Sequence, residues 1–249
     1  MNKRSTLGIL MALSLFAQAS IAACDDPPAR RVNWLGCDKQ GADLSGVDLR
    51  EAVLTRANFN NAIFIGARLN GADFGRSQLN KTDFTEAMML GTRMVGAQLN
   101  DAIFVQATMS KARLERAMLA GADFSGAEMS EAKLYKADLS AATLENAILN
   151  RADLSEADLT DAILNKVQAQ YATLSKAVLE SASLQGADLS YAKLDGANLL
   201  GADFSNANLS RADLHNARDD GAEFSGAQLD STIWINRQRC RPGSVGTCQ

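Results

Sequence analysis

The chain has 249 residues, of which 47% are apolar and 22% are charged, and its formal net charge is −4. The apolar fraction and the ordinary glycine and proline contents exclude a disordered chain. An unbroken repeat fills most of the length and leaves room for a single domain.

Residues 1–23 have the composition of a secretory signal peptide. Two basic residues near the start precede an apolar run over 7–19, and small residues follow it. The run is too short to span a bilayer comfortably. We therefore expect cleavage after Ala22 or Ala23, which changes the formal net charge from −4 to about −6. The protein is then expected to be exported, either to the periplasm or out of the cell. An uncleaved membrane anchor is the alternative.

Four cysteines lie outside the repeat, at Cys24, Cys37, Cys240 and Cys248. An even number of cysteines in an exported chain indicates disulfides. Proximity along the chain favours Cys24 with Cys37 and Cys240 with Cys248, which gives one loop at each end. A zinc site is the alternative, but the spacing does not fit zinc and the single histidine lies within the repeat.

A second interpretation of Cys24 changes the location of the protein. The sequence Ile21-Ala22-Ala23-Cys24 loosely resembles a lipobox, in which the cysteine becomes an acylated N-terminus. Acylation would tether the protein to a membrane and leave Cys37 without a partner.

Residues 41–235 repeat one five-residue unit 39 times without an insertion or a deletion. The second place is Ala in 33 units, and the fourth place is Leu, Phe or Met in 36. A period of five would spread the large residues around an α-helix and alternate them between the faces of a long strand. The second and fourth places share one side of a short extended segment. A corner after every unit would therefore turn both places inward.

The aromatic residues indicate how many units make a coil. Trp34 and Trp234 lie 200 residues apart, and six phenylalanines are separated by multiples of 20: Phe64, Phe84, Phe104, Phe124, Phe204 and Phe224. A repeat of 20 residues is four units per coil, and 39 units make nearly ten coils. Like side chains would then stack at roughly the 4.8 Å spacing of adjacent strands, in an interior too narrow for a lumen.

These units resemble the pentapeptide-repeat family, whose pattern is A(D/N)LXX; the match covers residues 41–235 and, weakly, 32–40. The resemblance implies an all-β fold, a right-handed quadrilateral β-helix or β-solenoid of about ten coils with four pentapeptides per coil. We therefore expect a cleaved signal peptide over 1–23, an N-terminal cap over 24–40, the β-helix over 41–235 and a C-terminal cap over 236–249.

Both open ends of a stacked coil need covering, because each exposes apolar side chains and unpaired backbone groups. Trp34 and Trp234 lie there with the cysteine pairs, and exported relatives look similar, so we expect end caps. Docking of a partner at the ends, including end-to-end joining of copies, is the alternative. Asp219 occupies an inward place, where we expect an ion pair with Arg239 or Arg218. A buried acid with a raised pKa is the alternative.

No pattern in the sequence predicts catalysis, so we expect a non-enzymatic protein without catalytic residues, cofactor or metal. No cysteine lies beside a candidate base in the repeat, and no glycine-rich phosphate loop is present. The outward places are where a protein partner is expected. Arg93, Arg113 and Lys133 form a basic row, and Tyr171 and Tyr191 stack on an outer corner. A solvated surface without a partner is the alternative.

The leading interpretation is an exported solenoid that acts as a structural scaffold or a protein-binding surface in the bacterial envelope, with an unknown protein partner. Some members of the resembled family mimic B-DNA and bind topoisomerases. Such mimics are cytoplasmic and acidic along the contact face. The signal peptide argues against this alternative, and so do the basic row and a second one that consists of Arg56, Arg76, Arg116, Lys136 and Lys176. We expect no nucleic-acid partner, and no membrane contact unless Cys24 is acylated.

Overall fold

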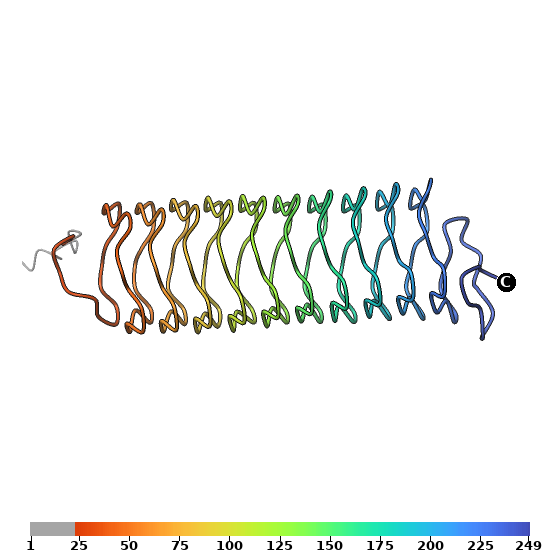
Figure 1. Ribbon diagram of the computed structural model, residues 1–249, viewed down its shortest axis with the longest axis horizontal. Helices are drawn as coiled ribbons and strands as arrows, with labels where there is room; N and C mark the ends of the chain where they lie inside the picture. The colour runs from red at the N-terminus through yellow and green to blue at the C-terminus, as the bar shows by residue number, and fades with distance from the viewer. Residues whose placement is uncertain (1–22) are drawn as a thin grey trace, which may run out of the picture.

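The computed structural model describes residues 23–249, so the predicted signal peptide lies outside the described residues except for Ala23. The chain winds into a straight rod of stacked coils, and its C-terminal segment folds over one end (Figure 1). From Asn33 to Ile233 the backbone pairs through isolated parallel bridges between residues 20 apart, and residues 23–249 form no longer strands or helices. The predicted coil of four five-residue units is therefore confirmed.

The bridges form four columns, one on each side of the rod. We call them the first face (Asn33 to Ile233), the second (Asp38 to Arg218), the third (Asp43 to Glu223) and the fourth (Asp48 to Gln228). Ten successive bridges make up the first face, so the regular coil begins about ten residues before the first perfect repeat unit. Because the chain visits the faces in this order within each coil, the first and third faces lie on opposite sides.

The corners are tight turns that need a left-handed residue. In the turn after Leu54, the amide of Ala57 donates to the carbonyl of Leu54 at 3.3 Å, and Arg56 between them has a φ of 58°. This is the pattern of a type II turn, which favours glycine at that position. Every first place from Gly41 to Ser231 has a positive φ, yet only 13 of the 39 are glycine. The stacked coils therefore outweigh a cost of roughly 1 kcal/mol at each of the others.

Hydrogen bonding to the backbone explains why Asp and Asn are frequent at the third place. The fifth-place amide has no backbone acceptor in most units, and a third-place side chain accepts it instead. Asp123 Oδ1 accepts the amide of Ser125 at 2.9 Å and its hydroxyl at 2.5 Å. Where the third place lacks such an acceptor, an asparagine in the coil before can replace it, as when Asn70 accepts the amide of Leu90 at 2.9 Å. The local sequence thus satisfies a donor that the coil itself leaves unpaired.

The interior is a continuous apolar column without a lumen. Second- and fourth-place side chains are buried along the rod, and the phenylalanine row stacks as predicted. The ring centroids of Phe84 and Phe104 lie 5.0 Å apart, and those of Phe104 and Phe124 lie 4.7 Å apart. Serine and threonine at second places bury their hydroxyls with a hydrogen-bond partner, as when Thr82 Oγ1 donates to the carbonyl of Phe59 at 2.9 Å. This packing holds each coil on the next.

The N-terminal end is covered by the segment that precedes the coil. Trp34 is fully buried, its indole N–H donates to the carbonyl of Asp26 at 3.2 Å, and the ammonium of Lys39 lies 4.5 Å from the ring centroid. The sulfur atoms of Cys24 and Cys37 lie at bonding distance, 1.98 Å apart. The arrangement is compatible with the predicted pair.

The C-terminal end is covered by a reversal of the chain. Arg239 pairs antiparallel with Ile233 on the first face, and Val245 pairs antiparallel with Gln228 on the fourth. The sulfur atoms of the second cysteine pair, Cys240 and Cys248, also lie at bonding distance, and the ring of Trp234 packs 5.0 Å from Phe224. The tail thus pairs with two edges of the last coil.

The predicted ion pair of Asp219 is wrong. Among residues 23–249, Asp219 forms no ion pair, and Arg239 instead donates to the carbonyl of Ser231 at 3.4 Å. The expectation assumed that the 20-residue register continues past Trp234. The chain reverses there, so Arg239 lies beside the first face, and Asp219 is only partly buried in the last coil.

Candidate functional surface

Function must reside on the outside of the rod, because side chains fill its interior. Within residues 23–249, no group of three or more His, Cys, Asp or Glu side chains is placed to hold a metal. In the same part of the chain, no helix is long and apolar enough to cross a membrane. The single histidine, His215, contacts Asp213 through its Nδ1 at 2.8 Å. The expectation of a non-enzymatic protein stays a prediction.

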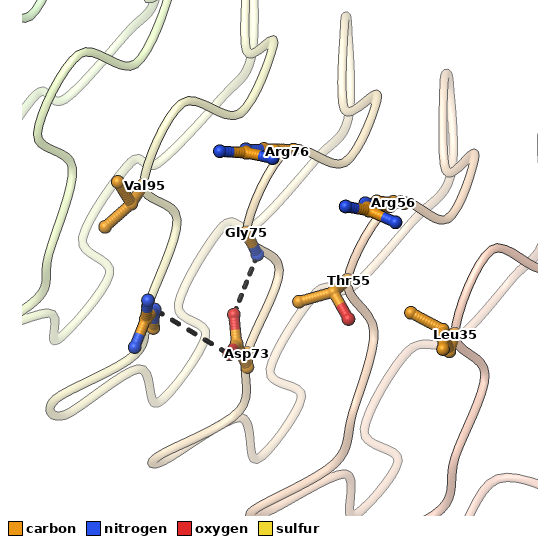
Figure 2. A pocket seen from close by; sticks show the side chains of 8 residues that line it. Leu35, Thr55, Arg56, Asp73, Gly75, Arg76 and Val95 are labelled. Atoms are coloured by element: carbon orange, nitrogen blue, oxygen red, sulfur yellow. Dashed lines mark hydrogen bonds and ion pairs between the residues drawn. The ribbon is translucent and has the colours of Figure 1, made fainter.

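A notch on the first face is one of several shallow depressions of similar volume on the exterior, and it is the one that contains a fifth-place glycine. Gly75 is the only glycine at a fifth place, and its φ is not left-handed, so the backbone does not require glycine there. A Cβ at this position would lie 3.1 Å from Asp73 Oδ1 and 3.5 Å from the methyl of Thr55. The missing side chain opens a shallow depression of about 300 Å³ that is walled by Leu35, Thr55 and Val95 (Figure 2).

Two arginines stand along one edge of the notch. Arg56 and Arg76 come from equivalent corners of adjacent coils and extend side by side in the same direction (Figure 2). Neither forms an ion pair with a carboxylate of residues 23–249. The acid in the notch, Asp73, is already engaged: it accepts the Gly75 amide at 2.9 Å and lies 3.7 Å from Arg93 Nε. Two guanidinium groups are therefore available to an anionic group beside a depression whose lining mixes the apolar side chains of Leu35 and Val95 with polar groups.

The notch belongs to a larger basic region. The structure brings the predicted row together, because Arg93, Arg113 and Lys133 are joined by successive bridges on the first face. The edge between the first and second faces adds four more bases. We call this region the basic surface; all of its residues are exposed, and they are Arg56, Arg76, Arg93, Arg113, Arg116, Lys133 and Lys136.

Part of the basic surface is already paired with acids. Arg113 Nη2 lies 3.0 Å from Glu115, and Lys136 Nζ lies 3.1 Å from Glu156. The hydrogen bond with Glu156 raises the pKa of Lys136, and the same contact lowers the pKa of Glu156. Exposed pairs of this kind add little to stability. Four bases of the surface, Arg56, Arg76, Arg116 and Lys133, form no ion pair with a carboxylate of residues 23–249, and two of them stand at the notch.

The tyrosine pair lies on the other edge of the first face, but its rings are already covered. Tyr171 and Tyr191 stack with centroids 4.6 Å apart, Arg151 lies over the first ring and Arg211 over the second. Arg211 also donates to the Tyr191 hydroxyl at 2.6 Å. All four faces of the two rings are thus occupied within the column, and only their edges face solvent. The pair is exposed, at 50% and 38%, without offering a stacking platform.

Sequence reasoning did not single out the notch. The signal was present: a glycine at a place otherwise filled by a side chain, with arginines at the following place of two adjacent coils, Arg56 and Arg76. The structure was needed to interpret this glycine. A glycine with a positive φ meets a requirement of the backbone, whereas one without a positive φ leaves open the space that a side chain would fill.

Comparison with known sequences gives consistent matches along the repeat. The profile described as pentapeptide repeats matches in eight copies, which together extend over residues 40–233: 40–76, 67–106, 97–135, 107–146, 137–170, 162–199, 182–218 and 197–233. No match was found among the curated proteins.

Solved structures share the fold. HetL, a pentapeptide repeat protein involved in heterocyst differentiation regulation in the cyanobacterium Nostoc sp. strain PCC 7120, is 30% identical, with a TM-score of 0.54, over 81% of this chain and 92% of its own. QnrB1, a plasmid-mediated fluoroquinolone resistance protein, is 17% identical, with a TM-score of 0.56, over 63% of this chain and 84% of its own. The second likeness concerns the fold alone. Together they establish a right-handed quadrilateral β-helix.

Proposed function

Because the chain belongs to the pentapeptide-repeat family, we propose that it is a non-enzymatic, exported rod that binds an acidic partner protein along the basic surface. The observation that carries the proposal is the notch at Gly75. Two unpaired arginines stand there beside a depression that Leu35 and Val95 line in part, on a rod whose interior is closed. Arginine binds a carboxylate through two parallel hydrogen bonds. Burial of an aliphatic side chain of the partner against the apolar walls would add binding free energy.

Export is part of the proposal and rests on two features. Residues 1–23 have the composition of a cleaved signal peptide, and both cysteine pairs lie at bonding distance, which suits an oxidising compartment. Intact-mass measurement of the mature protein tests both features. We expect a mass that begins near Cys24 and lacks four hydrogens. A mass increase corresponding to a lipid on Cys24 would instead establish the tethered form.

Binding is tested by affinity capture from an envelope extract with the mature protein as bait. Two variants probe the site: Arg56→Glu with Arg76→Glu reverses the charge, and Gly75→Val fills the notch. A β-branched side chain fits beside a third-place aspartate, because Thr85 occupies this place after Asp83. Lys166→Glu with Lys193→Glu makes the same charge change elsewhere. We expect at least about tenfold less captured protein with the arginine variant, a smaller loss with Gly75→Val and no loss with the control.

Two results would contradict the proposal. Equal retention by the wild type and the arginine variant would remove the basic surface from the function. Turnover of a substrate by the purified protein would contradict its non-enzymatic character.

A further inference from the structure

Over the stretch from Arg56 to Lys136, two opposite sides of the rod carry opposite charge, whereas beyond it the first face also carries Asp153, Asp195 and Asp213. The third and fifth places of the third face contain six acidic residues and no lysine or arginine. Four more acids lie along its edge with the second face, and one base, Lys81, lies on the same edge. We call this region the acidic surface, and its acids are Asp43, Asp83, Asp101, Asp123, Glu145, Asp161, Glu180, Asp203, Asp220 and Glu223.

The two charged regions lie at the same heights along the rod. Because each coil contains 20 residues, the residue number gives the position along the rod axis. The basic surface extends from Arg56 to Lys136, and the central acids from Asp83 to Glu145 overlap most of that length. Two acids, Asp73 and Glu115, lie among the residues of the basic surface, and both are engaged by neighbouring arginines.

We propose that the acidic partner includes a second copy of this chain, packed side by side so that the basic surface of one rod contacts the acidic surface of the next. This inference rests on the proposed function, because it names an occupant of the same surface. A sideways shift of one rod, without rotation, places the first face of one copy against the third face of another. The same shift puts the edge that carries Arg76 and Arg116 against the edge that carries Asp101 and Asp161.

Both contacting faces also offer exposed aliphatic side chains. On the third face these are Ile63, Ile103 and Ile163, at 36%, 37% and 40% exposure. On the first face, Leu35 and Val53 are 45% and 40% exposed beside the notch. Charge complementarity would then select the orientation, while burial of these aliphatic groups adds attraction.

The expected association is weak and open-ended. One face of about ten coils at roughly 4.8 Å, three extended residues wide, offers about 500 Å² per copy, which is at the lower limit for specific contacts. The contact is heterologous, since each copy uses two different faces. Repeating this contact therefore produces an open-ended row of parallel rods and not a closed dimer.

Sedimentation velocity of the mature protein tests the proposal, at protein concentrations from about 10 µM to about 1 mM. We expect the mean sedimentation coefficient to rise with concentration at about 50 mM NaCl and to fall to the monomer value at about 500 mM. A monomer throughout, or a closed dimer that salt does not dissociate, would overturn the proposal.

Charge-reversal variants test which two faces form the contact between copies. The acid-to-base variant is Asp101→Lys with Asp161→Lys, and the base-to-acid variant is Arg76→Glu with Arg116→Glu. Lysine and glutamate occupy the equivalent corner place in other units, so both variants should fold. Each variant alone should stay monomeric. Their equimolar mixture should associate again, because both mixed contacts are complementary. The control, Glu128→Lys on the fourth face, should associate like the wild type.

The outcomes separate this inference from the proposed function. If the mixture fails to associate, or if the control loses association as the variants do, the side-by-side contact is wrong. A monomeric protein whose arginines still capture an acidic envelope protein would overturn this inference and leave the proposed function standing. Loss of both behaviours would overturn both.

Discussion

Asp48 shows how a single contact adjusts the surface chemistry of this rod. Arg50 donates to its carboxylate through Nε at 2.8 Å and Nη2 at 2.5 Å, and these hydrogen bonds lower the pKa of Asp48 from 3.8 to about 2. Because the pKa is lower in the folded chain, the stability that the contact contributes is complete above about pH 4. It is lost as the pH falls through about 2.

Replacing the donor should restore an ordinary titration. In Arg50→Gln we expect the pKa of Asp48 to rise toward 3.8, measured by NMR titration of its side-chain carboxyl. The pKa of Asp43, which a hydrogen bond from Ser45 lowers, serves as the internal control and should not move. An unchanged pKa of Asp48 would show that Arg50 does not hold its carboxylate.

The third-place carboxylate should matter through its acceptor oxygen rather than through its charge. Asp123→Ala leaves the amide of Ser125 without its side-chain acceptor and should lower the free energy of unfolding by about 1 kcal/mol. Asp123→Asn keeps an acceptor in the same position and should cost clearly less. Urea denaturation followed by circular dichroism compares the two. Equal losses in both variants would assign the effect to charge.

At the scale of the coil, stability comes from identical side chains stacked in register. Phe104 lies between Phe84 and Phe124 and is fully buried. Each coil contacts only its neighbours, so a defect should weaken the rod locally. The end segments matter for the same reason, because they cover coils that have a neighbour on one side only.

Truncation of one stacked ring tests this description. Phe104→Ala should lower the free energy of unfolding by about 3–5 kcal/mol, because it removes a buried ring and leaves a cavity. Phe104→Leu places in the row the residue that Leu144 contributes at the equivalent position, and it should cost less. Hydrogen exchange should rise mainly in the adjacent coils. Uniform acceleration along the whole rod would contradict the nearest-neighbour description.

At the scale of the whole molecule, the sequence predicted the interior better than the exterior. The period of five and the 20-residue rows led to the coil, because buried places tolerate few residue types. The outward places accept almost any residue, so the opposed charges of the first and third faces appear only when residues are sorted by face. The pairing of Asp219 was wrong because the chain reverses after Trp234, and no periodicity extends into that turn.

The central claim is that 20 residues advance the chain by one coil. Electron paramagnetic resonance tests it with spin labels at Ile63→Cys and Ile163→Cys, two exposed positions on the third face. A sample without these substitutions checks that the native cysteines stay unlabelled. Five coils at roughly 4.8 Å predict a narrow distance distribution near 24 Å. A broad distribution, or a distance far beyond this value, would contradict the account.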